Sequence, residues 1–562
     1  RQHADAALIA RAQRQLKHLH AKRQRATRNE WRRHIRSDEQ MLYRCGDEAN
    51  AYDKLQRVIG LSKRSRSRGT TKGVHALMDD TGRVVTDAHA IAEVFRTHIG
   101  RSSNAAAREL TGDETELLQR TAATPLTRGT ANLRTPATED EVRRHIKHLQ
   151  NGKAAGPDGT YPELLKIGGP DTLRAVTALF NAVLRTGVWP TRWGEGDVVP
   201  IPKPGGDKLQ ANDYRGISLL PVLSKVLEAV LNTRLSQWLE ENGALHDAQH
   251  GFRPGRCTLD AAFVLHELVA ATRETAPWSR RTAAQRAAQP APAPAPHHTI
   301  FVAYLDVRQA YDECWRQAII AQLRARGIDA HTCALFDSML AAGKVRRTVR
   351  VNGVRSEEFG VDVGVPQGAV LSPALYNTFV DSIARALEAD PRSFGAVAHG
   401  IRIPSLLYAD DIALFAHSAE QLQQMLDACA QHAQRWRFSF NAAKCAVKIV
   451  GRDAAAARTR SAERPFTIAD GTGQRHAVQT VETFKYLGLR PDFLQPAGHS
   501  ARWDAQLNAH IAAANRASAQ LFAAVRQRRW MPPATVMRLF GTHCAPKAEY
   551  GAQIWAPFMR AN

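Results

Sequence analysis

Two adjacent acidic residues, Asp410 and Asp411, lie between two short apolar runs of the sequence, residues 405–407 and 412–416. Such an arrangement is typical of a β-hairpin, which would put both carboxylates at its tip. Neighbouring carboxylates repel each other, and a divalent cation relieves that repulsion because hard cations take oxygen ligands. Aspartate is also common in plain turns, so the pair alone is compatible with a metal site or a polar turn.

A third acidic residue, Asp306, directly follows the apolar residues 301–305, which predict a β-strand. Residues 307–323 have helical spacing, so Asp306 would lie between a strand and a helix, where it can meet the tip of a neighbouring hairpin. Asp306, Asp410 and Asp411 would then hold two Mg²⁺ ions, with Mn²⁺ as a substitute. In such a site one metal ion lowers the pKa of an attacking 3′-hydroxyl group, and the other neutralises charge on the leaving pyrophosphate.

The sequence between these acidic residues contains a loop rich in glycine and proline, residues 364–373, which leads into a helix predicted at 371–387. Backbone without side chains lets a flat base and sugar approach closely. Gln367 can support a nucleotide by hydrogen bonds, and Gly368 follows it. The loop is therefore a candidate nucleotide-binding segment, although glycine- and proline-containing loops before helices are common.

The composition is that of a folded protein with an excess of positive charge. The chain has 562 residues, of which 44% are hydrophobic and 23% charged, and its formal net charge is +22. This length predicts about two to four domains or subdomains. The charge favours a polyanionic partner, nucleic acid first and an anionic membrane second. No run of about 18 apolar residues occurs, so we expect no membrane span, and residues 1–36 lack the pattern of a signal peptide.

The seven cysteines are scattered, and no Cys-x-x-Cys pair occurs. Neither a disulfide framework nor a zinc knuckle is predicted, and reduced thiols indicate an intracellular protein.

Several segments have a distinct composition. Residues 1–36 contain eleven Lys or Arg and two acidic residues, which predicts a basic helix or a solvated arm. Residues 63–68 form a second basic cluster, and residues 276–298 are rich in proline and alanine, which predicts an exposed loop. After residue 500 the pattern becomes helical and basic. The chain begins with Arg1 rather than Met, which indicates a piece of a longer protein.

Together, the ordered segments closely resemble the reverse transcriptases of non-LTR (LINE-like) retrotransposons. The matching segments are residues 151–159, 199–205, 214–220, 249–260, 305–312, 364–376, 408–411, 441–444 and 484–489. The resemblance implies that segments 305–312 and 408–411 contain the catalytic carboxylates and that segment 364–376 faces the nucleotide.

The resemblance also implies roles for individual residues. Asp306, Asp410 and Asp411 would be catalytic and would bind the metal ions. Tyr311 would be a steric gate whose ring crowds a ribose 2′-hydroxyl group and so favours dNTPs, although by residue type alone it would be a core aromatic. The other implied roles are triphosphate binding by Lys203 and Arg215, contact with the nucleotide by Gln367 and Gly368, proton donation to pyrophosphate by Lys444, and a primer grip at Tyr486, Leu487 and Gly488.

The implied fold is α+β, a right-hand polymerase with fingers, a palm with an antiparallel sheet and a helical thumb, preceded by a basic helical N-terminal extension. The implied domains are the extension at 1–150, fingers and palm at 151–450, and primer grip and a truncated thumb at 451–562.

The implied activity is RNA-directed DNA synthesis, a nucleotidyl transfer with an RNA template, a DNA primer or target and dNTPs as partners. We expect an intracellular protein, in the nucleus with a cytoplasmic ribonucleoprotein stage. Gly216 stands where the family commonly has proline, which would loosen that turn.

Two other interpretations stay open. A group II intron or retron-type reverse transcriptase shares the catalytic motifs, although the segments at 249–256 and 364–373 are more similar to LINE-like elements. A decayed or domesticated copy would bind RNA without catalysis, but such a copy should have lost a carboxylate, and all three are present.

Overall fold

The computed structural model describes residues 73–104, 109–271, 299–341, 343–392, 394–398, 400–451, 453–488, 504–527, 537 and 539–550. The basic segments predicted at 1–36 and 63–68 and the proline- and alanine-rich loop at 276–298 lie outside these residues. The described residues fall into two compact units, a large one from Gly73 to Ala505 and a small one from Gln506 onward.

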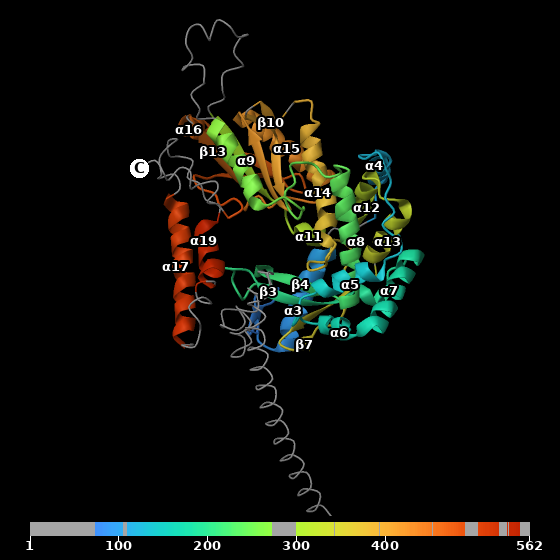
Figure 1. The fold of residues 1–562 in the computed structure, drawn as a ribbon. Helices are drawn as coiled ribbons and strands as arrows, with labels where there is room; N and C mark the ends of the chain where they lie inside the picture. Colours follow the sequence, from blue (N-terminus) through green and yellow to red (C-terminus); the bar gives the residue numbers. More distant parts are fainter. Residues whose placement is uncertain are drawn as a thin grey trace, which may run out of the picture. The chain divides into compact units, whose positions relative to one another are not determined.

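The large unit is built around a five-stranded sheet with the strand order β11-β12-β5-β13-β16. One strand of this sheet, β13, is labelled in Figure 1. β12 and β13 flank β5 in antiparallel pairs, and β16 joins β13 in parallel. The strand predicted at 301–305 and the hairpin predicted around Asp410 are confirmed. The strands of this sheet are β5 (Thr299–Asp306), β11 (Ser405–Tyr408), β12 (Asp411–Ala416), β13 (Ala446–Gly451) and β16 (Gln479–Thr480).

A second sheet has the strand order β4-β3-β6-β7, with β8 paired to β6. β3 and β4 form an antiparallel hairpin, and β3 pairs with β6 in parallel. Its strands are β3 (Glu195–Pro202), β4 (Tyr214–Leu219), β6 (Arg346–Val351), β7 (Val354–Arg355) and β8 (Phe359–Gly360).

The other elements of the described residues are helices and short two-stranded ladders. The helices are α3 (Ala88–Asn104), α4 (Gly112–Ala123), α5 (Glu139–His148), α6 (Pro162–Ile167), α7 (Gly169–Thr186), α8 (Val222–Glu241), α9 (Thr258–Ala271), α11 (Ala310–Glu313), α12 (Arg316–Ala325), α13 (Ala330–Leu340), α14 (Ser372–Glu388), α15 (Ala419–Arg435), α16 (Ala454–Glu463), α17 (Asp504–Gln527) and α19 (Ala545–Glu549). The ladders are β1 (Leu77–Met78) with β2 (Val84–Val85), β9 (Ala396–Ala398) with β10 (Ile401–Ile403), and β14 (Thr467–Ala469) with β15 (Arg475–Ala477).

Both faces of the central sheet are buried, because side chains alternate between the faces and each set is apolar. Leu305 and Ile412 share one core with side chains of α12, α14 and α15. Tyr304 and Phe415 point to the opposite face, where they pack with side chains of α9. Helix α3 packs in a third core against the second sheet, through Phe95 and other apolar side chains. The two sheets are therefore each held by their own apolar contacts.

The single helix predicted for residues 307–323 is wrong. Gln309 has a left-handed backbone (φ 42°), and an extended residue, Cys314, separates α11 from α12. The backbone here pairs outside the helix: the carbonyl groups of Tyr311 and Cys314 accept hydrogen bonds from the N–H groups of Val365 (2.7 Å) and Gly364 (3.0 Å). The helix predicted at 371–387 is confirmed as α14.

The mixed content of helices and sheets confirms the predicted α+β class. None of the helices in the described part of the chain has the long apolar stretch that a membrane span needs.

Candidate active site

The three predicted carboxylates meet where the strands β5 and β12 of the central sheet end and begin. Asp306 ends β5 and Asp411 begins β12, and the two residues are direct partners in the antiparallel register. Tyr408 pairs with Asp411, which leaves Ala409 and Asp410 as the two-residue turn of the hairpin. Strand alternation places Asp306 and Asp411 on the sheet face of Tyr304. The predicted convergence of strand end and hairpin tip is therefore what the structure shows.

The surroundings of Asp410 and Asp411 disfavour the ionised form of both side chains. Asp411 stays exposed at the start of β12, but the protein around it takes away part of its water and raises its pKa to about 6, and the nearby charges of Asp410 and Asp306 add to this effect. Burial likewise raises the pKa of Asp410, with a further contribution from Asp306, whereas Arg215 and Lys444 act in the opposite direction. Lys444 places its Nζ 3.5 Å from Oδ2 of Asp306. The cluster thus carries more negative charge than its own basic neighbours neutralise.

Carboxylate oxygens are the ligands that Mg²⁺ and Mn²⁺ accept, so the donor set fits a hard divalent cation. Within the described residues, no three His, Cys, Asp or Glu side chains converge closely enough to hold a metal ion by themselves. Mg²⁺ in enzymes that act on nucleotides is commonly held by one or two carboxylates together with substrate phosphates. The arrangement at Asp306, Asp410 and Asp411 therefore fits a metal ion that arrives with its substrate.

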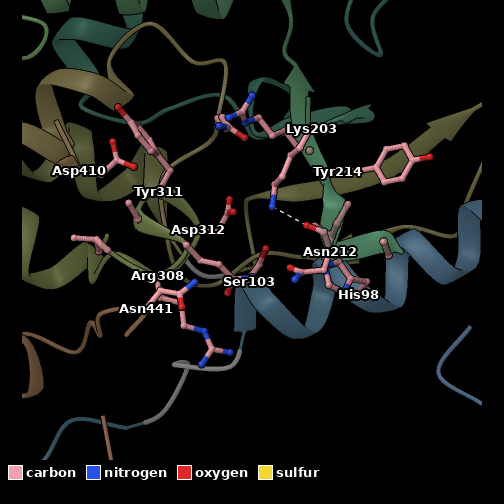
Figure 2. A pocket seen from close by; sticks show the side chains of 18 of the residues that line it. His98, Ser103, Lys203, Asn212, Tyr214, Arg308, Tyr311, Asp312, Asp410 and Asn441 are labelled. Atoms are coloured by element: carbon pink, nitrogen blue, oxygen red, sulfur yellow. Dashed lines mark hydrogen bonds between the residues drawn. The ribbon is translucent and has the colours of Figure 1, made fainter. Parts of the chain in front are cut away.

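A cavity of about 820 Å³ opens beside the carboxylates. It brings together most of the predicted site residues, which come from both sheets and the loops between them: Lys203, Arg215, Asp306, Tyr311, Gln367, Asp410 and Lys444. Figure 2 shows Asp410 and Tyr311 on one side of this cavity and Lys203 on the other. Asp411, Gly368 and the predicted primer grip do not line it.

The two predicted triphosphate residues belong to the β3–β4 hairpin. Lys203 directly follows β3, and Arg215 lies on β4 opposite Ile201. The Lys203 ammonium group donates a hydrogen bond to the carbonyl oxygen of Asn212 (2.6 Å). This bond holds the ammonium group beside the segment that connects β3 to β4. Both cations therefore face the cavity that contains Asp410.

Tyr311 is half-buried, and its ring stacks on the ring of Tyr376 with centroids 4.9 Å apart. Burial and the negative charge of Asp410 raise the pKa of the Tyr311 phenol, so it stays neutral at physiological pH. The stacking partner lies on α14, which fixes the ring where it lines the cavity.

The loop that contains Gln367 is fixed by hydrogen bonds to buried charged side chains. Arg316 donates to the carbonyl oxygens of Gly364 (2.7 Å) and Val363 (3.1 Å). The carboxylate of Glu228 accepts hydrogen bonds from the N–H groups of two residues just before α14, Val370 (2.7 Å) and Leu371 (3.3 Å). A buried charged side chain is costly unless its hydrogen bonds are formed. Movement of the loop would break the hydrogen bonds of Arg316 and Glu228, so these two side chains hold the loop rigid.

Gln367 and Gly368 also connect the loop to the second sheet. The carbonyl oxygen of Gln367 accepts a hydrogen bond from the Ser218 N–H group (2.9 Å). Gly368 has φ 114°, and a Cβ atom there would lie 2.8 Å from the Ser218 carbonyl oxygen. A side chain at position 368 would push the two segments apart, so the requirement for glycine is structural.

Comparison with known proteins decides the family. The model of the family described as "Reverse transcriptase (RNA-dependent DNA polymerase)" matches residues 201–490, which include every carboxylate described above. The chain belongs to the reverse transcriptase family. This match and the curated relatives from mobile elements together confirm the predicted resemblance to non-LTR retrotransposon reverse transcriptases, and reverse transcriptases use divalent metal ions.

Curated reverse transcriptase relatives share about a quarter of their aligned residues with the chain. It is 28% identical over 317 residues to the RNA-directed DNA polymerase from mobile element jockey of Drosophila funebris, which covers 55% of the chain and 31% of that protein. It is 27% identical over 445 residues to the probable RNA-directed DNA polymerase from transposon BS of Drosophila melanogaster (76% and 43%). It is 27% identical over 354 residues to a retrovirus-related Pol polyprotein from retrotransposable element R2 of Popillia japonica (63% and 44%). The matches span less than half the length of each of these relatives.

The segment predicted as the reverse transcriptase primer grip packs under the central sheet. Tyr486 is only 4% exposed, and its ring centroid lies 5.4 Å from that of Tyr304. Phe484 stacks on Tyr304 at 4.0 Å. Leu487 and Gly488 both have positive φ, 48° and 89°, which makes a tight turn directly after Tyr486. The segment thus lies on the sheet face to which Asp306 and Asp411 belong, and its contact with a primer stays a prediction.

Several residues that line the cavity of this reverse transcriptase were not predicted from the sequence. Asp312 lies between Tyr311 and Lys203 (Figure 2), and burial raises its pKa to about 6, an effect that Lys203 opposes. His98 and Ser103 reach the cavity from α3, in a part of the sequence that contains no recognisable motif. Asp312 could have been predicted from the sequence, because it follows Tyr311 within the same matching segment. No sequence feature pointed to His98 and Ser103, since the spacing of residues in α3 is that of any amphipathic helix.

Proposed function

We propose that the chain is an RNA-directed DNA polymerase that joins dNTPs to a primer 3′-hydroxyl group by copying an RNA template. The observation that carries this proposal is the cavity in which Asp306 and Asp410 face Lys203 and Arg215. Carboxylates suited to a divalent cation on one side and fixed cations on the other match the needs of phosphoryl transfer, which depends on positioning and charge stabilisation.

The side chains divide the work by their chemistry. Lys203 and Arg215 bind the triphosphate, and Arg215 suits a phosphate because its guanidinium group is planar and always charged. The Tyr311 ring excludes a ribose 2′-hydroxyl group, and the Gln367 loop supports the nucleotide. Asp306, Asp410 and Asp411 would hold two Mg²⁺ ions, or Mn²⁺, which would supply positive charge for activation of the 3′-hydroxyl group and for stabilisation of the pyrophosphate. Lys444, held 3.5 Å from Asp306, donates a proton to the leaving pyrophosphate.

We infer a right-hand architecture from these parts. The central sheet is the palm, the second sheet belongs to the fingers, and the helical residues after 500 belong to the thumb. The domains follow as a basic N-terminal extension at 1–150, fingers and palm at 151–450, and primer grip and thumb at 451–562. Helix α3 lies inside the proposed extension, yet it packs on the second sheet and lines the cavity. This packing indicates that the end of the extension supports the fingers and forms part of the cavity wall.

The partners follow from the proposed reaction. An RNA template, a DNA primer or target and dNTPs are all polyanions, and the net charge of +22 supports binding to them. A chromosomal DNA target places the protein in the nucleus, with a cytoplasmic ribonucleoprotein stage in which it binds its RNA. The relatives from jockey, transposon BS and R2 favour a non-LTR retrotransposon enzyme over a group II intron or retron enzyme.

Primer extension tests the proposal directly. The purified protein is given oligo(dT)-primed poly(rA), dTTP and Mg²⁺, and incorporation of dTTP is measured beside binding of the hybrid. The expected result is incorporation that depends on the divalent cation and disappears when Asp410 and Asp411 are both changed to alanine. Binding of the hybrid without any incorporation would instead identify a catalytically silent RNA-binding protein. Full activity of the double variant would refute the site assignment.

A further inference from the structure

The edge of the central sheet is covered by a segment that is far away in sequence. The Leu407 N–H group donates to the carbonyl oxygen of Ala248, and the His250 N–H group donates to the carbonyl oxygen of Leu407, each at 2.8 Å. Gln249 forms a parallel bridge with Leu407 between these two bonds. Residues 248–251 therefore act as a short additional strand beside β11, which is otherwise the edge strand and carries the catalytic turn.

The side chain of Gln249 continues this pairing into the turn itself. It is fully buried, and its Oε1 accepts hydrogen bonds from the N–H groups of Ala409 (3.0 Å) and Gly251 (2.8 Å). Both partners are donors, so the amide oxygen, rather than the amide nitrogen, must face them. Ala409 directly precedes Asp410 and has a left-handed backbone (φ 57°). A residue other than glycine adopts that conformation only where its surroundings impose it.

Gly251 lies against the same turn from the other side. A Cβ atom at this position would overlap the Ala409 nitrogen and would lie 3.0 Å from the carbonyl carbon of Tyr408. The Asn377 side chain, on α14, donates a hydrogen bond to the Gly251 carbonyl oxygen (2.7 Å). The bare backbone of Gly251 is therefore held in contact with the turn that carries Asp410.

Arg253 anchors the end of this segment. Its guanidinium group forms two hydrogen bonds with the Glu240 carboxylate, both 2.8 Å long, and also donates to the carbonyl oxygens of His246 (2.9 Å) and Gln249 (3.1 Å). Planar two-point pairing of this kind fixes orientation as well as distance. Arg253 thus ties the backbone of Gln249 to helix α8.

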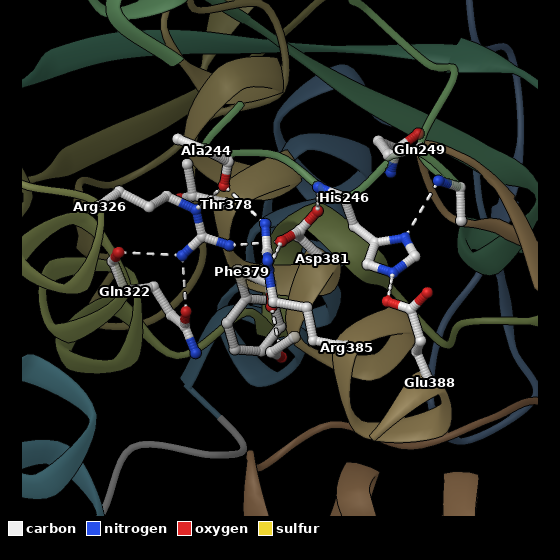
Figure 3. A network of polar contacts seen from close by, with 12 residues as sticks. Ala244, His246, Gln249, Gln322, Arg326, Thr378, Phe379, Asp381, Arg385 and Glu388 are labelled. Carbon is white, nitrogen blue, oxygen red and sulfur yellow. Dashed lines mark hydrogen bonds and ion pairs between the residues drawn. The ribbon is translucent and has the colours of Figure 1, made fainter. Parts of the chain in front are cut away.

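A buried ionic network anchors the beginning of the segment (Figure 3). The Asp381 carboxylate accepts hydrogen bonds from the His246 N–H group (2.5 Å), Arg326 (2.6 Å) and Arg385 (2.7 Å). Arg326 and Arg385 also donate to the carbonyl oxygen of Ala244, at 3.1 and 2.8 Å. Asp381 and Arg326 are completely buried. Because a buried charge is costly unless all its partners are in place, the network holds residues 244–246 in one position on α12 and α14.

We propose that Gln249 is a positioning residue of the active site. Its side-chain oxygen holds the left-handed turn at Ala409, and through that turn it fixes where Asp410 and Asp411 present their carboxylates. The segment around it is anchored at both ends, so the position of Gln249 is set by the protein core rather than by the hairpin. The predicted effect of Gln249 on catalysis rests on the proposed polymerase function. Its predicted effect on the conformation of the turn rests on the hydrogen bonds alone.

The test compares Gln249→Met, which keeps the side-chain length and removes the acceptor, with Gln249→Glu. Glutamate keeps an accepting oxygen and removes an amide nitrogen that has no partner among the described residues. Two quantities are measured: hydrogen–deuterium exchange of a peptide covering residues 405–414, and the single-turnover rate of dTTP incorporation at saturating hybrid and nucleotide. Gln237→Met is the matched control, because Gln237 is exposed on α8.

We expect exchange at the turn to accelerate at least about 10-fold in Gln249→Met, because the Ala409 N–H group loses its acceptor. The incorporation rate should fall at least about 10-fold while hybrid affinity changes less than about 3-fold, since positioning affects the chemical step more than binding. Gln249→Glu should recover most of both quantities, because burial keeps its carboxyl group protonated and one oxygen still accepts from the Ala409 N–H group. Gln237→Met should match the wild type. Gly251→Ala should reproduce the Gln249→Met effects without touching the acceptor.

The two measurements separate the two proposals. Unchanged exchange at 405–414 in a folded Gln249→Met variant would overturn the positioning role. A normal rate in that variant would overturn it as well. A wild-type protein that binds the hybrid but incorporates no dTTP would refute the polymerase function, while the exchange measurement would still decide what Gln249 does to the turn.

Discussion

Asp306 and Asp411 lie directly opposite each other on neighbouring antiparallel strands. Like charges in this position destabilise a sheet, and here Asp410 adds a third carboxylate next to them. The fold tolerates this repulsion because the surrounding strands are apolar and buried on both faces. Charge repulsion in the free protein therefore becomes a driving force for binding cations.

Replacement of Asp411 by asparagine should stabilise the protein while it removes activity. Because the pKa of Asp411 is raised to about 6, its ionised form is unfavourable at neutral pH, and a neutral isostere removes that cost. We expect a higher midpoint of thermal unfolding and a loss of incorporation of about 100-fold or more. Thermal unfolding without metal and dTTP incorporation with Mg²⁺ measure the two effects. An Asp411→Asn protein that is less stable than the wild type would contradict this account, and Asp337→Asn, at an exposed position of α13 outside the site, serves as control.

The stabilising effect of Mg²⁺ should increase with pH. Asp411 and Asp312 both have a pKa raised to about 6, so between their unfolded values and about 6 the folded protein binds more protons than the unfolded chain. Without metal, these two groups therefore make the free energy of unfolding fall as pH rises from about 4 to about 6. Mg²⁺ needs the ionised carboxylates, so its stabilisation is small at about pH 5 and full at about pH 8.

Thermal unfolding with and without millimolar Mg²⁺ across this pH range provides the measurement. The Asp411→Asn variant should lose most of the pH dependence of the metal effect. A metal effect that is equal at both ends of the range would show that the carboxylates do not titrate as described.

Lys203→Gln should weaken nucleotide binding. The ammonium group faces the cavity and supplies fixed positive charge for a triphosphate. We expect the KM for dTTP to rise about 10-fold, which corresponds to about 1.4 kcal/mol, with a smaller change in kcat. Lys208→Gln, in the same β3–β4 connection but not lining the cavity, should leave KM unchanged. Equal effects of the two substitutions would indicate a general loss of charge rather than a specific contact.

Tyr311→Val should relax the selection of dNTPs over rNTPs. The ring is held at the cavity wall by stacking on Tyr376, so its removal opens space where a 2′-hydroxyl group can fit. We expect the ratio of kcat/KM for dTTP to that for UTP to fall at least about 10-fold. Tyr376→Phe keeps the stacking ring and removes a buried hydroxyl group that has no partner among the described residues, so discrimination should be retained. A Tyr311→Val enzyme with unchanged discrimination would exclude the gate.

The sequence allowed the carboxylate cluster to be predicted because each Asp adjoins an apolar strand whose pattern is unambiguous. The break at Cys314 could not be predicted, since helical spacing continues through it and only pairing with the 364–373 loop interrupts the helix. The support of the turn by Gln249 was equally hidden, because a glutamine in a loop gives no indication of its distant partner.

Helix α3 has a consequence for how small an active fragment can be. The family match begins at residue 201, and every predicted catalytic carboxylate lies after that point. A protein trimmed to the matched residues would keep those carboxylates but lose His98, Ser103 and most of β3, and with them one wall of the cavity. We therefore expect the minimal autonomous polymerase in this chain to begin before α3, more than 100 residues upstream of the boundary that family membership marks.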